Sequence, residues 1–268
     1  MTPTSAVPIA PWQLAIASLL IVLTGALSLA LRLGLERSLA IAALRTVVQL
    51  SLIGYVLKWI FAVDNPLILL VAMTAMIAVA AHAAIGRSKH IYAGILERSF
   101  VSLFFSGLLT TFIVTAAIIQ IRPWYHAQYV IPLLGMILGN GLTGISLALD
   151  ALLESLSERR GEVEMELAQG ATKWEAARGP LSDAVRRGMI PNINSMMVVG
   201  IVSLPGMMTG QILAGADPLQ AVKYQIIVMF MIAAATALGC IAIALLTYQR
   251  LFNERHQLMW GLIRRRIP

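Results

Sequence analysis

The sequence predicts an all-α polytopic membrane protein with about seven transmembrane helices and a cytoplasmic coupling segment between two of them. Of its 268 residues, 59% are hydrophobic and only 12% are charged, against roughly a quarter charged in an ordinary soluble domain. The charges are clustered and leave several apolar runs of about 20 residues, the length that crosses a hydrocarbon core. We therefore expect residues 1–268 to form a single membrane domain.

Seven apolar runs predict the spans in chain order. They cover residues 12–31, 39–61, 66–85, 100–121, 131–153, 190–213 and 224–248. No Lys or Arg precedes the first run, which is too long for a signal-peptide core, so we expect a retained span with Trp12 as an aromatic anchor. Cys240, the single cysteine, lies inside the last run, where we expect a buried small hydrophobic residue.

The distribution of Lys and Arg predicts the orientation. With the N-terminus outside, sixteen of the 20 basic residues fall in inner segments and three in outer ones, and inner loops favour positive charge. The C-terminus is then cytoplasmic. The net charge of +7 reflects this topology and an attraction to anionic lipid headgroups. We expect membrane lipids as partners and no nucleic acid.

The acidic residues and the missing motifs narrow the function. Asp64 and Asp217 lie in predicted outer loops and Asp150 near the inner end of the fifth span, whereas proton-coupled carriers usually bury carboxylates along the pathway. The sequence has no Gly-Lys dipeptide for a phosphate-binding loop, and no HExxH, paired CxxC or GxSxG motif. We expect no enzyme activity in this chain; energy for transport would come from another protein.

The long inner segment, residues 154–189, predicts short helices. The leucines from Leu149 to Leu156 continue the fifth span as an amphipathic helix. Arg159 and Arg160 suit its last turn, and Gly161 its C-terminal cap. An acidic helix follows and ends at Gly170.

A second short helix follows that glycine. Thr172 and Glu175 have the spacing of a capping box, and Gly179-Pro180 predicts the end of the helix. The two helices form a compact knob. The knob either fits a groove on a soluble partner or only shortens the path back to the membrane.

This inner segment resembles the coupling segment in the membrane subunits of ABC transporters. Their coupling segment has a Glu-Ala-Ala-x-x-x-Gly pattern followed by Leu-Pro or Ile-Pro. Here Glu164 and Gly170 have the expected separation, and Ile190-Pro191 follows. Met165 and Glu166 replace the two alanines, so this general pattern is weak by itself.

A longer resemblance is more specific. The stretches "NSMMVVGIVSLPGMMTGQILAGADPLQAVKYQIIVMF", "GYVLKWIFAVD" and "LTYQRLFNERHQL" are similar to the FetB family. Members of this family are membrane subunits paired with a separate ATPase and associated with iron export, and plant members are linked to aluminium tolerance. The resemblance runs from about Arg45 to Leu258.

The resemblance implies a homodimeric permease in the bacterial cytoplasmic (inner) membrane, with a separate ABC ATPase that binds ATP and magnesium. This chain itself would hold no cofactor. The ATPase would dock on the segment that contains Glu164, Gly170, Ala171, Thr172 and Trp174. The substrate would be iron or another metal cation. A lipid, a sugar nucleotide or another small molecule stays open as the substrate, as does a non-transporting scaffold or sensor that recruits an ATPase.

Four polar residues in the spans are candidates for the pathway. Arg45 and Gln49 share one helix face. Either both residues line a cavity, or Arg45 lies close enough to the inner interface for its guanidinium to reach it. His82 is a candidate metal ligand or an interfacial residue. Asn140 lies among Gly135, Gly139, Gly141 and Gly144, which favour close helix packing.

A proline and several methionines interrupt the sixth run. Met196, Met197, Met207 and Met208 carry thioethers, which suit a soft cation such as copper(I), whereas iron prefers oxygen and nitrogen donors. Adjacent methionines diverge on a helix, so flexible packing is the favoured interpretation; the metal site stays unknown. Pro205 and Gly206, with Met207 and Met208, predict a hinge or re-entrant gate in the outer half of the pathway, or a static kink.

Overall fold

The computed structural model describes residues 9–63 and 65–265, most of which are helical. Within these residues, six helices are long and apolar enough to cross a membrane. They are α1 (Pro11–Ala30), α2 (Glu36–Val63), α3 (Pro66–Gly86), α4 (Ile95–Phe112, continued by the π-helical turn η1, Ile113–Ile118), α5 (Ala127–Glu158) and α9 (Pro218–Leu251). The predicted all-α membrane fold and the first five and the last of the spans are confirmed. Asp64 lies outside the described residues.

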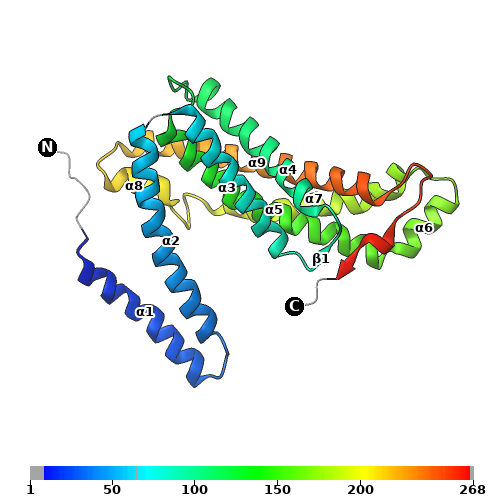
Figure 1. Cartoon of the computed structure of the whole chain (residues 1–268), viewed down its shortest axis with the longest axis horizontal. Coiled ribbons are helices and arrows are strands. Elements are labelled where there is room, and N and C mark those ends of the chain that lie inside the picture. Colours follow the sequence, from blue (N-terminus) through cyan, green and yellow to red (C-terminus); the bar gives the residue numbers. More distant parts are fainter. Residues whose placement is uncertain (1–8, 64, 266–268) are drawn as a thin grey trace.

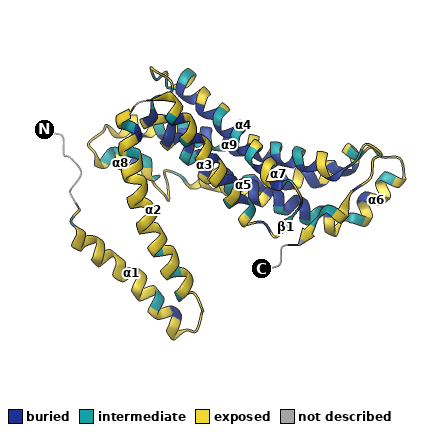
Figure 2. Cartoon of the chain, in the orientation of Figure 1, coloured by how far each residue is buried: buried dark blue, intermediate teal, exposed yellow. Residues whose placement is uncertain are grey.

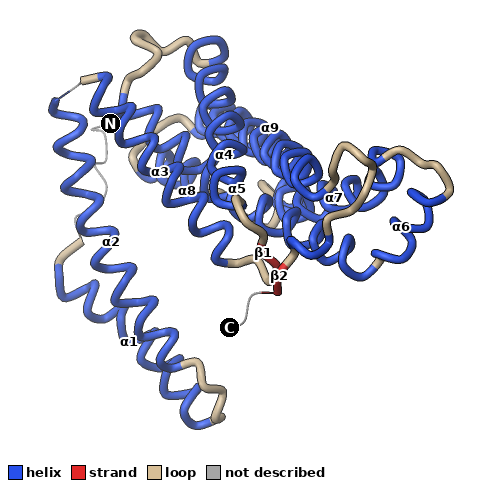
Figure 3. The backbone as a smooth tube through the Cα atoms, turned by 45° about the vertical axis from the view of Figure 1, so that its right-hand side comes forward, coloured by secondary structure: helices blue, strands red, loops and turns tan. Residues whose placement is uncertain are grey.

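The helices form an elongated bundle with a separate arm (Figure 1). α3, α4, α5 and α9 pack together with α7 (Lys173–Val198), whereas α1 and α2 form a hairpin that projects from the bundle (Figure 3). Ser28 is the buried residue of α1 and Ile60 that of α2, so the hydrophobic core lies in the bundle (Figure 2). We call the bundle end that carries α6 (Arg160–Ala168) the inner end, following the predicted orientation.

α7 is one continuous helix from the inner end toward the middle of the bundle. The predicted end at Gly179-Pro180 is wrong, because both Pro180 and Pro191 lie inside α7. A proline inside a helix removes one hydrogen bond and crowds the preceding turn. Burial of Ala176, Ala177, Leu181 and Ala184 against α5 and α9 compensates, so tertiary packing overrides the local signal.

The sixth predicted span, 190–213, is two helices rather than one. α7 ends at Val198, and α8 (Gly206–Leu213) starts after Pro205. Between them, residues 199–205 form a turn that we call the break. Gly200 has a φ of +83°, which favours glycine, and its N–H donates to the Ser203 carbonyl at 2.9 Å. The predicted interruption at Pro205-Gly206 is therefore present, but it begins six residues earlier.

Three helices meet at two glycines and a cysteine. A Cβ added at Gly188 on α7 would lie 2.7 Å from the Cys240 sulfur on α9 and 2.7 Å from the Gly144 carbonyl oxygen on α5. A Cβ at Gly144 would overlap Thr236 of α9. The expected close packing holds for Gly144, while Gly139 has open space around it. Cys240 is fully buried, as predicted.

This crossing predicts opposite effects for two substitutions in α7. Gly188→Ala places a methyl group against the backbone of Gly144 and lowers stability by about 1–3 kcal/mol. Gly179→Ala, the matched control, meets no atom within 4 Å and raises stability by about 0.5–1 kcal/mol through helix propensity. Thermal unfolding in detergent measures both. A Gly188→Ala protein as stable as the parent would contradict the close approach.

Candidate functional site

At the inner end, residues 160–174 form a compact turn, which we call the coupling segment. It contains the short helix α6, but the second short helix predicted for the knob is instead the start of the long helix α7. α6 ends at Ala168, and Gly170 has a φ of +96°, a conformation that favours glycine. The predicted cap at Gly161 is wrong, because α5 ends at Glu158 and Gly161 lies in the first turn of α6. Only Arg159 separates the two helices, and it closes the turn by donating to Glu162 at 2.7 Å.

The capping box at the start of α7 is confirmed. The Thr172 hydroxyl accepts from the Glu175 N–H at 3.3 Å, and the Glu175 carboxylate accepts from the N–H and the hydroxyl of Thr172 at 2.7 Å each. These two hydrogen bonds, led by the one from the backbone N–H, lower the pKa of the Glu175 carboxyl. The turn between α6 and α7 therefore has a fixed geometry.

The end of α9 and the chain that follows it contact the coupling segment at three points. The Arg160 guanidinium lies 4.1 Å from the centre of the Trp260 ring, a cation–π contact. The Lys173 N–H donates to His256 Nδ1 at 2.9 Å. The ring of Trp174 meets that of Tyr248, in the last turn of α9, edge-on at 5.8 Å. The coupling segment is thereby joined to α9 as well as to α7.

The predicted coupling residues gather on an exposed surface. Gly170 and Thr172 are exposed, Ala171 is half-buried, and 48% of Trp174 is exposed. Glu164 is exposed too, but its carboxylate accepts from the Arg160 guanidinium at 2.7 Å. The structure thus brings the five residues into one segment in which the 170–172 turn is free to contact a partner.

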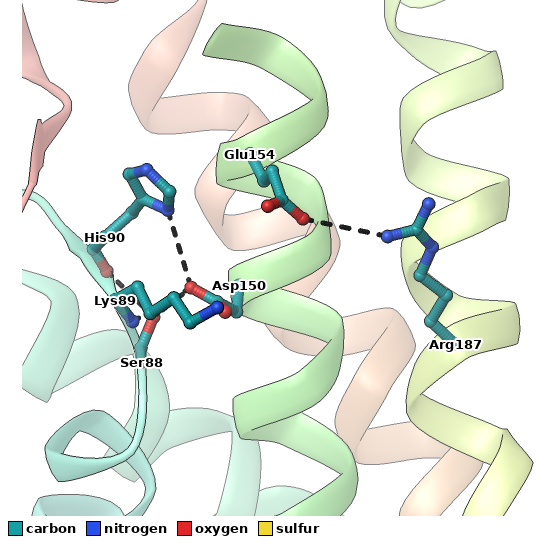
Figure 4. Close-up of polar contacts among 6 residues, drawn as sticks. All are labelled: Ser88, Lys89, His90, Asp150, Glu154 and Arg187. Carbon is teal, nitrogen blue, oxygen red and sulfur yellow. Dashed lines mark hydrogen bonds and ion pairs between the residues drawn. The ribbon is translucent and has the colours of Figure 1, made fainter. Parts of the chain in front are cut away.

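A polar cluster beside this segment was not predicted (Figure 4). Asp150 on α5 accepts from the Lys89 N–H at 2.9 Å and from the Ser88 hydroxyl at 3.3 Å, and His90 Nδ1 lies 3.5 Å from the same carboxylate oxygen. The loop between α3 and α4 is thus held against α5. Its strand β1 (His90–Ile91) pairs antiparallel with β2 (Arg264–Arg265) of the C-terminal chain.

An ion pair in the same view joins α5 to α7. Arg187 lies 3.7 Å from the carboxylate of Glu154 (Figure 4). Both side chains are well exposed, so the pair contributes little to stability. Together with the Asp150 contacts, it shows that polar contacts join the inner part of α5 to α7 and to the loop after α3. The sequence signal for this cluster was an acidic residue at the end of an apolar span.

Two cavities are lined in part by α8, and the first of them is also lined by the break. The first, of about 430 Å³, is lined by Met196, Met208 and Met229 among others. The second, of about 490 Å³, is lined by Met136 and Met207 among others. The adjacent methionines therefore face different cavities, in keeping with their divergence on a helix, and each meets methionines from other helices.

The four predicted pathway residues do not line either cavity. Arg45 and Gln49 are exposed on the projecting helix α2, and His82 is exposed on α3. Asn140 is exposed on α5, where its side-chain amide donates to the Met136 carbonyl at 2.9 Å. In residues 9–63 and 65–265, no group of three or more His, Cys, Asp or Glu side chains is placed to hold a metal ion.

Two glutamines stand out beside the cavities. Gln225 lines the first cavity and Gln211 the second, and the buried side-chain oxygen of each has no hydrogen-bond partner within the described part of the chain. Sequence reasoning missed both. For Gln225, the available signal was its position four residues before Met229, which places both side chains on the same face of an apolar helix.

Comparisons with known proteins agree with the resemblance found in the sequence. The model of the uncharacterised protein family UPF0014 matches residues 11–252. The UPF0014 membrane protein YjkA of Bacillus subtilis is 40% identical over 87% of this chain and 91% of its own length. The probable iron export permease protein FetB of Escherichia coli is 34% identical over 92% and 94%.

A plant protein is similar as well. Protein ALUMINUM SENSITIVE 3 of Arabidopsis thaliana is 32% identical over 91% of this chain and 88% of its own length. No solved structure matches the chain.

The capping box predicts a pH-dependent start of α7. A carboxyl whose pKa is lowered by folding stabilises the fold above its unfolded pKa, and this contribution is lost as the pH falls through its folded pKa. Thr172→Ala removes the hydroxyl, so we expect the Glu175 pKa to rise and the helix start to weaken by about 0.5–2 kcal/mol. NMR titration of Glu175 and hydrogen exchange in the first turn measure these effects.

The control is Thr172→Ser, which keeps a hydroxyl at the cap. It should leave the Glu175 pKa and the exchange rates near those of the parent. An unchanged Glu175 pKa in Thr172→Ala would refute the role of the hydroxyl.

Proposed function

Because the chain belongs to the UPF0014 family, we propose that it is the membrane-spanning permease subunit of an ABC transporter that exports iron or another metal cation. A separate ATPase subunit, which binds ATP and magnesium, supplies the energy. Two copies of this chain bind two ATPase subunits in the cytoplasmic membrane. The name of the Escherichia coli relative supports the transport of iron.

The observation that carries the proposal is the exposed 170–172 turn and its connection to the break. The turn lies at the start of α7, and α7 runs without interruption to Val198, next to the break. A displacement of the turn is therefore transmitted along about 40 Å of helix. The contacts of Arg160, Lys173 and Trp174 with the end of α9 and the chain after it carry the same displacement to that helix.

The experiment that tests the proposal is metal flux in proteoliposomes that contain this chain and its ATPase. We expect ATP-dependent movement of a metal cation, with iron compared against copper(I), zinc and manganese. An ATPase activity that no metal changes, together with no flux of any metal, would refute the exporter. A chain that binds the ATPase without any ATP-dependent flux would instead favour the scaffold or sensor.

Substitutions at Gly170 test the docking surface separately. Gly170→Asn adds a side chain but tolerates the left-handed conformation, whereas Gly170→Val adds similar bulk and strains the backbone by about 1–2 kcal/mol. If the ATPase covers this turn, both variants should weaken ATPase binding at least tenfold, by about 1.4 kcal/mol or more. Pull-down titration and ATPase stimulation measure the loss.

The two variants separate docking from strain. Weak binding only in Gly170→Val would assign the effect to backbone conformation. Normal binding in both variants would contradict docking at the turn. Gly179→Asn, on an exposed glycine of α7 outside the coupling segment, is the control and should bind normally.

A further inference from the structure

The first cavity beside the break is a site where three helices converge. Its volume is about 430 Å³, within the range of small-ligand sites. α7 contributes Met196, α8 contributes Met208, and α9 contributes Gln225 and Met229; the break contributes Gly200 and Pro205. The residues that line it carry no formal charge.

The donor atoms in this cavity are neutral and mostly soft. Met208 is 7% exposed and lies at the first turn of α8. Gln225 and Met229 are four residues apart on α9 and share one helix face. Three methionine side chains from three helices therefore line one space. This convergence of separate helices is not visible from the spacing of methionines within one helix.

Gln225 gives the cavity an unpaired hydrogen-bond acceptor. The residue is only 6% exposed, and its side-chain oxygen finds no partner in the described part of the chain. A buried polar atom without a partner costs about 1–3 kcal/mol. A bound positive charge near this oxygen would offset that cost, so the position points to a ligand.

The chemistry of the donors selects among cations. Thioether ligands favour soft ions such as copper(I), whereas magnesium and manganese prefer carboxylates and water. Removing an ion from water into an apolar site is costly, and it is more costly for a divalent than for a univalent ion. A site with no carboxylate to neutralise charge therefore favours a univalent ion.

From these features we infer that the cavity binds a soft univalent cation of the copper(I) class. Met196, Met208 and Met229 supply sulfur ligands, and Gln225 supplies an oxygen. The role of this site in transport rests on the proposed function: if the chain is a permease, the site defines the class of cation that it accepts at the break. The flexible methionine side chains close around the ion from a cavity larger than the ion itself.

Silver(I) binding to the purified full chain in detergent tests the inference. Silver is a soft univalent ion that is not oxidised during the measurement. The protein carries Cys240→Ala, because a thiol would bind silver by itself. Equilibrium dialysis should show tight, saturable silver binding and much weaker iron(II) binding. X-ray absorption of the bound silver should show sulfur neighbours, which in this protein come only from methionine.

Two triple variants locate the site. Met196→Leu, Met208→Leu and Met229→Leu together preserve volume and should reduce silver affinity by about 10–100-fold or more. The matched control replaces Met76, Met165 and Met259, which do not line the cavity, and should bind silver like the parent. Thermal unfolding verifies that both triple variants fold.

Three results would overturn the inference. They are equal silver affinity in the two triple variants, iron(II) binding as tight as silver binding, and binding of an apolar fluorescent probe at the cavity without silver binding. The last result would assign the cavity to a lipophilic ligand. Because binding is measured without the ATPase, a negative result here leaves the proposed function intact, and failed metal flux leaves this site intact.

Discussion

The close crossing of α5, α7 and α9 is the constraint on which the rest of the structure depends. Gly188 and Gly144 let the backbones approach, and Cys240 fills the remaining space. Since the two glycines have no side chain, the backbone of α7 lies close to that of α5, and Cys240 of α9 packs against both. This packing also explains how α7 passes two internal prolines as one helix. The coupling segment and the break consequently lie at opposite ends of one continuous helix.

The two ends of α7 differ in how firmly they are held. At the inner end, a capping box, a cation–π contact and a backbone hydrogen bond to His256 define the turn. At the other end, the break is a short turn with Ile201 87% exposed and Val202 80% exposed. Few packing contacts hold such a segment, so a local change of conformation there costs little. A rigid start and a loosely held end suit a helix that transmits motion.

The sequence predicted the parts of this fold that depend on local chemistry. Apolar runs gave the six long helices, and the Thr172–Glu175 spacing gave the start of α7. The predicted helix ends at Gly161 and at Gly179-Pro180 were wrong, and so was the single helix predicted for the sixth span. At these places, packing against other helices or the start of the next helix determines where a helix ends. The contacts of Trp260 and His256 with the coupling segment and the cavity around Gln225 could not be predicted, because they join residues far apart in the chain.

Hydrogen exchange with and without the proposed ATPase and ATP measures whether α7 carries motion from the coupling segment to the break. We expect exchange in residues 199–205 to change when the ATPase binds ATP, while residues 181–192 around Gly188 stay protected. Loss of protection at 181–192, or an unchanged break in a complex whose coupling segment becomes protected, would contradict it.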